Sequence, residues 1–177
     1  MSSDWRTWEY DFPPFFTLQP VSQTRSQQIN SWAKIILSYC KSNSISSIDI
    51  TDKLFKNDKI SRSLSNEEIS TIYQELVKSG QLKYAKDLNG IENKSSVIVL
   101  WKSVATWADL IFKWAQNNAI SITTMFDIIN GDDAENEEFY KQNDELISQA
   151  LLHLQNSGKA EVFYNEVNVI EGVKFFF

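Results

Sequence analysis

Residues 29–46, INSWAKIILSYCKSNSIS, and residues 104–121, VATWADLIFKWAQNNAIS, are two versions of one pattern. Tryptophan holds the fourth position of both, as Trp32 and Trp107, and apolar residues then recur at the three- and four-residue spacing of an amphipathic helix. Further matches pair Ile35 with Leu110, Ile36 with Ile111, Tyr39 with Trp114, Asn43 with Asn118 and Ile45 with Ile120. The chain is therefore expected to contain the same helix twice, about 75 residues apart.

The segments that follow these helices repeat as well. Residues 69–87, ISTIYQELVKSGQLKYAKD, and residues 147–165, ISQALLHLQNSGKAEVFYN, each carry a helical apolar stripe, then Ser-Gly, then a strand pattern. A period this long does not fit a solenoid, but it fits a duplicated small domain. Each copy is expected to run helix, short strand, short helix, long helix and hairpin, which is the winged-helix arrangement. We prefer this duplication to a chance likeness of two unrelated α+β segments.

The expected fold class is α+β, with two tandem winged-helix domains in a rigid rod, preceded by an extended proline-aromatic tail. The expected boundaries are residues 1–23 for the tail, 24–102 for the first domain and 103–177 for the second. The first helix is expected to begin near Thr24, which has capping-box spacing to Gln27. The predicted strand SVIVLW (96–101) runs into the next helix without a Gly/Ser linker, so a stiff junction is expected.

The later helix of the first copy has clear end signals. Ser65 and Glu68 have the spacing of a capping box, and Gly80 is suited to a left-handed helix end. Residues 86–95, KDLNGIENKS, contain an Asn-Gly pair at 89–90, which predicts the turn between the two strands of the first wing.

Charge argues against a general affinity for nucleic acid or for an anionic membrane. The net charge of the 177 residues is −6, whereas such binding needs a positive field. The helices that precede the two wings lie at 65–80 and 143–158, and most of their charged residues are acidic, although a helix that enters a DNA groove needs basic residues. The pattern indicates a protein-interaction module, and the alternative is a tandem winged-helix regulator that binds nucleic acid.

The chain shows the features of a cytosolic protein. Its single cysteine, Cys40, excludes an internal disulfide. The N-terminus has neither the basic nor the apolar part of a signal peptide, and no apolar run reaches membrane-spanning length.

Motifs for catalysis, cofactors or metals are absent from the sequence, so no enzyme activity, cofactor or metal is expected. There is no phosphate-binding loop and no nucleophile elbow, and the one histidine, His153, lacks a plausible catalytic partner. An acidic stretch could suggest a calcium loop, but its spacing does not match, and a solvated acidic loop is the preferred interpretation. Its acids are Asp132, Asp133, Glu135, Glu137 and Glu138.

The segment DFPPFF, residues 11–16, presents aromatic residues around two prolines. Proline fixes its own φ and favours extended geometry in the residue before it, so a stiff, extended segment is expected. Its aromatic side chains could complete the core of the first domain or could fill a groove in a partner. Composition alone leaves these two interpretations even.

Several stretches resemble the family of small tandem winged-helix subunits of the ESCRT-II endosomal sorting complex. The resemblance covers nearly the whole chain, and its most specific parts are the Pro-Pro-aromatic start, the Leu-Trp-Lys-Ser junction and the glycine-led acidic stretch. The matching stretches are YDFPPFFTLQPVSQTRSQQINSWAKIILSYC (10–40), LFKNDKISRSLSNEEISTIYQELVKSGQL (54–82), VIVLWKSVATWADLIFKWAQNNA (97–119) and FDIINGDDAENEEFYKQNDELISQALLHLQNSGKAEV (126–162).

The resemblance implies a non-catalytic adaptor at the endosomal membrane surface. Two copies would attach to one complex, each on a different larger winged-helix subunit, and the second domain would recruit the first ESCRT-III subunit. The complex would sort ubiquitinated cargo into multivesicular bodies and would touch the membrane only indirectly. Pro13, Pro14, Phe15 and Phe16 match the motif that inserts into the larger subunits, although Phe16 stands where some relatives have tyrosine.

These implications give two expectations about surfaces. Phe12 and the four motif residues are expected to bind the larger subunits, with Phe15 and Phe16 exposed in the free protein and dispensable for folding. The acids from Asp132 to Glu138 are expected to attract a basic or amphipathic helix of the ESCRT-III partner.

Overall fold

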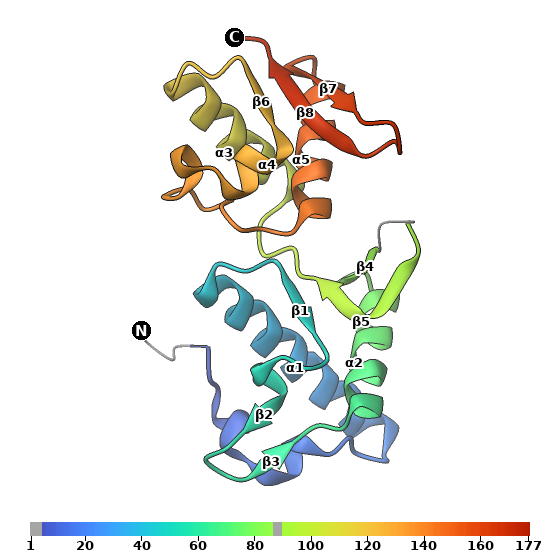
Figure 1. Ribbon diagram of the computed structural model, residues 1–177. Coiled ribbons are helices and arrows are strands. Elements are labelled where there is room, and N and C mark those ends of the chain that lie inside the picture. The colour runs from blue at the N-terminus through green and yellow to red at the C-terminus, as the bar shows by residue number, and fades with distance from the viewer. Residues whose placement is uncertain (1–4, 87–89) are drawn as a thin grey trace. The chain divides into compact units, whose positions relative to one another are not determined.

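The computed structural model describes residues 5–86 and 90–177, and the chain forms two compact units (Figure 1). The first unit is Met1–Trp101 and the second is Lys102–Phe177.

The first unit combines two packed helices with a three-stranded antiparallel sheet. The strand order β1-β5-β4 places the last strand of the wing in the centre, where it pairs with both others. The elements are α1 (Ser22–Asn43), β1 (Ser47–Asp49), the 3-10 helix η3 (Lys53–Phe55), β2 (Lys56–Asn57), β3 (Arg62–Ser63), α2 (Asn66–Lys78), β4 (Lys83–Lys86) and β5 (Glu92–Ile98).

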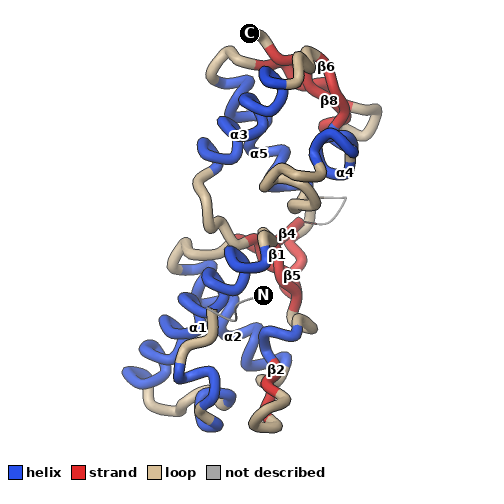
Figure 2. Tube along the Cα trace, turned by 90° about the vertical axis from the view of Figure 1, so that its left-hand side faces the viewer, coloured by secondary structure: helices blue, strands red, loops and turns tan. Residues whose placement is uncertain are grey.

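The second unit has the same topology. Its sheet order is β6-β8-β7, again with the last strand in the centre, and α3 and α5 pack together (Figure 2). The elements are α3 (Val104–Asn117), β6 (Ile122–Thr124), α4 (Met125–Asn130), the 3-10 helix η4 (Asp132–Ala134), α5 (Asp144–Asn156), β7 (Ala160–Tyr164) and β8 (Ile170–Phe175). The prediction of an α+β fold with two winged-helix units is confirmed.

The two copies differ where a short middle helix was predicted. The second copy has it as α4, whose N-cap Thr124 accepts a hydrogen bond from the Asp127 backbone N–H. The first copy has only η3 and the two-residue strands β2 and β3 at this place. The strand predicted at 96–101 corresponds to β5, which begins earlier, at Glu92. Asn89 of the predicted turn lies outside the described residues.

The first long helix ends in the same way in both copies. Ser44 after α1 and Ala119 after α3 adopt left-handed φ values of 52° and 53°. The next residue then donates back into the helix, from Ile45 N to Cys40 O at 3.0 Å and from Ile120 N to Ala115 O at 2.8 Å. This pattern is a Schellman cap, which satisfies carbonyls at the helix end that lack an intrahelical partner.

The N-terminal tail is neither extended nor separate from the first unit. It forms two 3-10 helices, η1 (Trp8–Asp11) and η2 (Pro13–Phe16), and Tyr10, Phe15 and Phe16 are only 1%, 6% and 2% exposed. The expectation that Phe15 and Phe16 are exposed in the free protein is therefore wrong. Proline φ suits the first residues of a 3-10 turn as well as an extended chain, and the turn allows both rings to reach the core.

Candidate partner-docking surface

The buried ring of Trp32 on α1 is the point on which the tail packs. Phe15 stacks on it with ring centroids 4.6 Å apart, and Phe16 meets it edge to face at 5.5 Å. Aromatic side chains of this size bury large apolar areas, so the tail forms part of the hydrophobic core of the first unit.

Gln28, a buried amide on α1, binds the backbone of the tail. Its Nε2 donates to Phe15 O and Thr17 O, both at 2.9 Å, and its Oε1 accepts from Gln19 N at 3.0 Å. One side chain therefore fixes three backbone groups around the end of η2. Buried amides that are paired in this way favour one conformation of the segment they hold.

Tyr10 holds the other end of the tail. Its hydroxyl lies 2.9 Å from Leu54 O and 2.8 Å from Lys56 O, to which it donates. Burial raises the pKa of the Tyr10 phenol to about 12, so the hydroxyl stays protonated as the donor that these carbonyls need.

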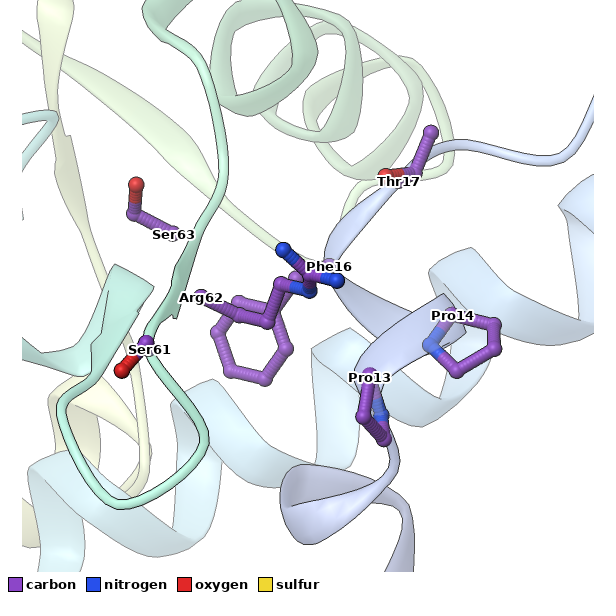
Figure 3. Close-up of a pocket in the computed structure, with 7 residues that line it drawn as sticks. All are labelled: Pro13, Pro14, Phe16, Thr17, Ser61, Arg62 and Ser63. Carbon is purple, nitrogen blue, oxygen red and sulfur yellow. The ribbon is translucent and has the colours of Figure 1, made fainter.

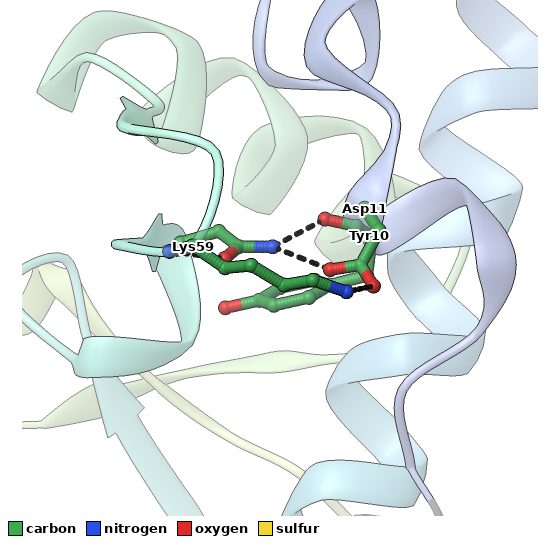
Figure 4. Close-up of polar contacts among 4 residues, drawn as sticks. Tyr10, Asp11 and Lys59 are labelled. Atoms are coloured by element: carbon green, nitrogen blue, oxygen red, sulfur yellow. Dashed lines mark hydrogen bonds and ion pairs between the residues drawn. The ribbon is translucent and has the colours of Figure 1, made fainter.

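Asn57 completes this attachment, at the place where Tyr10, Asp11 and Lys59 lie close together (Figure 4). Its Nδ2 donates to Tyr10 O at 2.7 Å and to Asp11 Oδ1 at 3.0 Å, and Lys59 Nζ lies 2.6 Å from Asp11 Oδ2. The hydrogen bonds from Lys59 and Asn57 lower the pKa of the Asp11 carboxyl. With Gln28 at one end and Asn57 at the other, the proline turn between them is held in a fixed position.

An apolar ridge remains on the outside of this fixed tail. Trp8 and Phe12 are 74% and 48% exposed, with ring centroids 6.0 Å apart, and Pro13 and Pro14 are exposed beside them. We call these four residues the proline ridge. Trp8 was not predicted as a site residue, because nothing in the local pattern separates it from the buried Tyr10 two positions later.

Two hollows flank the proline ridge, and Pro14 lines both. The first has a volume of about 540 Å³ and contains one basic residue, Arg62. In Figure 3 the Arg62 side chain and the Phe16 ring lie together in this hollow, between the two prolines on one side and the serines on the other. Its lining consists of Pro13, Pro14, Phe16, Thr17, Ser61, Arg62 and Ser63.

The second hollow is a groove of about 480 Å³ between the tail and α1. One wall carries aromatic residues of the tail and the other carries uncharged polar residues of the helix. The groove is lined by Trp8, Glu9, Phe12, Pro14, Phe15, Gln19, Thr24, Gln27, Gln28 and Ser31.

The predicted acidic surface lies on the second unit in a well-anchored segment. Asp132, Asp133, Glu135 and Glu138 are exposed and Glu137 is half-buried. The neighbouring Ala134 and Phe139 are fully buried, and Trp114 Nε1 donates to Asp133 O at 3.0 Å. Glu138 also forms an ion pair with Lys102, so this carboxylate differs from the others in having a fixed partner.

Groups suited to hold a metal ion are not found in the part of the chain that the structure describes. Residues 5–86 and 90–177 contain no cluster of three or more His, Cys, Asp or Glu side chains suited to a metal ion. Burial raises the pKa of the Cys40 thiol to about 12, which disfavours the nucleophilic thiolate, and His153 is exposed. None of the described helices is long and apolar enough to cross a membrane.

Comparison with known proteins shows the family to which this chain belongs. A family model described as ESCRT-II complex subunit matches residues 9–143. The chain belongs to the family of ESCRT-II complex subunits. Vacuolar protein-sorting-associated protein 25 of Danio rerio is 38% identical over 99% of this chain and 100% of that protein. The Homo sapiens protein of the same name is 38% identical over 99% of both chains.

Solved ESCRT-II structures resemble the whole chain. The crystal structure of subunit VPS25 of the endosomal trafficking complex ESCRT-II matches with a TM-score of 0.78 and 29% identity, over 99% of this chain and 100% of that one. A chain of the endosomal complex ESCRT-II (VPS22/VPS25/VPS36) matches with a TM-score of 0.75 over 96% and 98% of the two chains. The family predicted from the sequence is therefore confirmed, and the ESCRT-II family model spans most of the proline ridge and the acidic segment.

Proposed function

We propose that this chain is a non-catalytic subunit of an ESCRT-II complex that docks on the larger subunits through the proline ridge of its first unit. The observation that carries this proposal is an exposed apolar ridge on a rigid, buried support. A preformed surface loses little conformational entropy on binding. The ESCRT-II crystal structure that resembles this chain contains VPS22 and VPS36 beside VPS25, which are the corresponding candidate partners.

The motif residues have different roles in this proposal. Phe12, Pro13 and Pro14 contact the larger subunit directly, because they are exposed. Phe15 and Phe16 act from below, where they hold the two prolines in their turn against Trp32. Two copies of the chain use this surface in one complex, each on a different larger subunit.

Arg62 gives the docking a charged contact. Within residues 5–86 and 90–177 its guanidinium forms no ion pair, although it lies in the hollow beside Pro13 and Phe16. A guanidinium is a planar donor that binds a carboxylate through two parallel hydrogen bonds. The larger subunit therefore places an aspartate or glutamate in this hollow when the ridge docks.

Charge reversal at Arg62 tests the docking. Purified Arg62→Glu chain is titrated into the co-purified larger subunits, and the dissociation constant is expected to rise about a hundredfold, because the lost pair becomes a repulsion at a desolvated site. Arg62→Lys is expected to lie between this variant and the wild type. Lys113→Glu, on the exposed side of α3 in the second unit, is the control. If Arg62→Glu binds like Lys113→Glu, Arg62 does not take part in docking.

The second unit supplies the recruiting surface in this proposal. Asp132, Asp133 and Glu135 are exposed on a segment that buried residues hold in place, so they present a fixed negative field to a basic or amphipathic helix of the first ESCRT-III subunit. Glu137 and Glu138 belong to the same segment. Recruitment at the endosomal membrane surface, for the sorting of ubiquitinated cargo into multivesicular bodies, follows from this role.

The recruiting role predicts an effect on association rate. Asp133→Lys combined with Glu135→Lys is expected to slow binding of the ESCRT-III subunit markedly at low salt and less at high salt. Glu138 is left unchanged, since its pair with Lys102 would be broken as well. The control reverses Glu161 and Glu171, which are exposed on the wing strands β7 and β8. Equal association rates for the two double variants would count against the acidic segment.

A further inference from the structure

The groove between the tail and α1 has aromatic walls that remain accessible. Trp8 is mostly exposed, Phe12 is half exposed, and their rings lie near each other at one side of the groove. Thr24, Gln27 and Ser31 of α1 form the facing wall. Aromatic faces of this kind attract a cation through the negative charge of the ring face.

Glu9 contributes a negatively charged carboxylate to this groove. It lines the groove, and its Oε2 atom is buried without a hydrogen-bond partner among the described residues. None of the residues that line the groove is basic. Arg25, on α1, does not line it and donates to the carbonyls of Gln19 and Pro20 instead. A carboxylate oxygen buried without a donor is unfavourable, and a positive charge in the groove beside this carboxylate lowers that cost through its field.

We propose that this groove is a binding site for a cationic side chain, an arginine or a lysine, of the subunit that docks on the proline ridge. The positive head group pairs with Glu9 and lies over the rings of Trp8 and Phe12, while the aliphatic stem covers the apolar wall. A purely apolar side chain would fill the space but would leave the charge of the Glu9 carboxylate without a compensating charge in the groove. This inference rests on the proposed docking function.

The two hollows together define the orientation of the partner. Pro14 lines both, so an acid at Arg62 and a base at Glu9 reach the chain on opposite sides of the same ridge. A partner that docks in the reverse direction would bring like charges together at both places. Such charge placement contributes more to specificity than to affinity.

Glu9→Gln and Trp8→Ala test the inference separately. Each variant is titrated by calorimetry into the co-purified larger subunits, at low and at high salt. Both are expected to weaken binding about tenfold, and Glu9→Gln is also expected to reduce the salt dependence, because one ion pair is lost. Glu9→Gln is expected to leave the melting temperature unchanged or higher, since it removes the charge of a carboxylate whose Oε2 atom is buried without a donor among the described residues. Weaker binding without a loss of thermal stability is the result expected for a binding residue, whereas a structural residue would lose both.

Matched controls are available on the same unit. Glu75→Gln removes an exposed carboxylate from α2, and Leu37→Ala removes an apolar side chain that is 45% exposed on α1 outside the groove. If Glu9→Gln binds as tightly as Glu75→Gln, the cation site is overturned, and a loss confined to Trp8→Ala would mean that an apolar side chain occupies the groove. If the wild type fails to bind the larger subunits, the docking proposal itself fails, whereas normal binding by Arg62→Glu would remove only the charged contact at that residue.

Discussion

Phe16 lies between the rings of Tyr10 and Trp32, at centroid distances of 5.4 Å and 5.5 Å. Because Phe16 is only 2% exposed, it offers little surface to a partner, and its main effect on docking comes from holding the fold of the tail. The residues that can touch a partner are its neighbours on the outer side of the same turn, Pro13 and Pro14.

Phe16→Ala is therefore expected to destabilise the first unit. Truncating a buried phenylalanine costs about 3–5 kcal/mol, because contacts are lost and a cavity remains. Urea unfolding of the isolated chain measures this loss. Phe12→Ala, four positions away and half exposed, is the control and is expected to change stability by less than about 0.5 kcal/mol. Equal stability of the two variants would show that the tail does not belong to the core.

Glu68 connects the tail to α2 in a way that depends on pH. Its Oε1 accepts from Leu18 N and its Oε2 accepts from Ser65 N, both at 2.9 Å. Partial burial alone would raise the pKa of this carboxyl, but the hydrogen bonds from Ser65 and Leu18 outweigh it and lower the pKa below its ordinary value of 4.5.

The lowered pKa fixes the sign of the pH effect. The contribution of ionised Glu68 to folding stability is fully present at a pH above the ordinary pKa of 4.5. It is lost as the pH falls through the lower pKa of the folded state. Unfolding measured across the acid range should show a shallower loss of stability for Glu68→Gln than for the wild type. Glu67→Gln, on the same helical turn but exposed, should follow the wild-type curve. An unchanged slope for Glu68→Gln would contradict this assignment.

At the scale of elements, the C-terminal cap of α3 contains a position at which a substitution should increase the stability of the second unit. Ala119 takes a left-handed φ of 53° after α3, where a Cβ atom is unfavourable. Ala119→Gly is expected to stabilise the second unit by about 0.5–1 kcal/mol, measured as a higher melting temperature. Ala105→Gly, inside the exposed first turn of the same helix, should destabilise it by a similar amount. A loss of stability for Ala119→Gly would contradict the cap geometry.

The duplicated helices and wings could be predicted because their apolar spacing and end signals are local. The missing short helix of the first copy could not, since its cause is distant in sequence. The Tyr10 hydroxyl lies 2.9 Å and 2.8 Å from the carbonyl oxygens of Leu54 and Lys56, so the tail holds the backbone directly after η3, where Lys56 is extended. A contact across 44 residues leaves no trace in the local pattern.

The candidate site could be predicted only in part, because its geometry also depends on contacts between residues distant in sequence. The sequence identified Phe12, Pro13 and Pro14, but it could not divide the aromatic residues into outer and inner ones. That division follows from the 3-10 turns and from Gln28 and Asn57, which lie on other elements. Trp8 and Arg62 were missed because each becomes a ridge or hollow residue only after the tail has folded onto the first unit.

At the scale of the whole molecule, the candidate surfaces belong to different units of the chain. The proline ridge lies in the first unit and the acidic segment in the second, and each is held by the core of its own unit. In the proposed function, one chain therefore binds its complex with the first unit and offers the second to a further partner.

The most direct test of this account is the dissociation constant of the Pro13→Ala, Pro14→Ala double variant for the co-purified larger ESCRT-II subunits. A buried CH₂ group contributes about 0.8 kcal/mol, so loss of the two rings is expected to weaken binding by about tenfold to a hundredfold. Because both prolines are exposed in the free chain, folding should change by at most about 1 kcal/mol at each position. A dissociation constant equal to that of the wild type would contradict docking through the proline ridge.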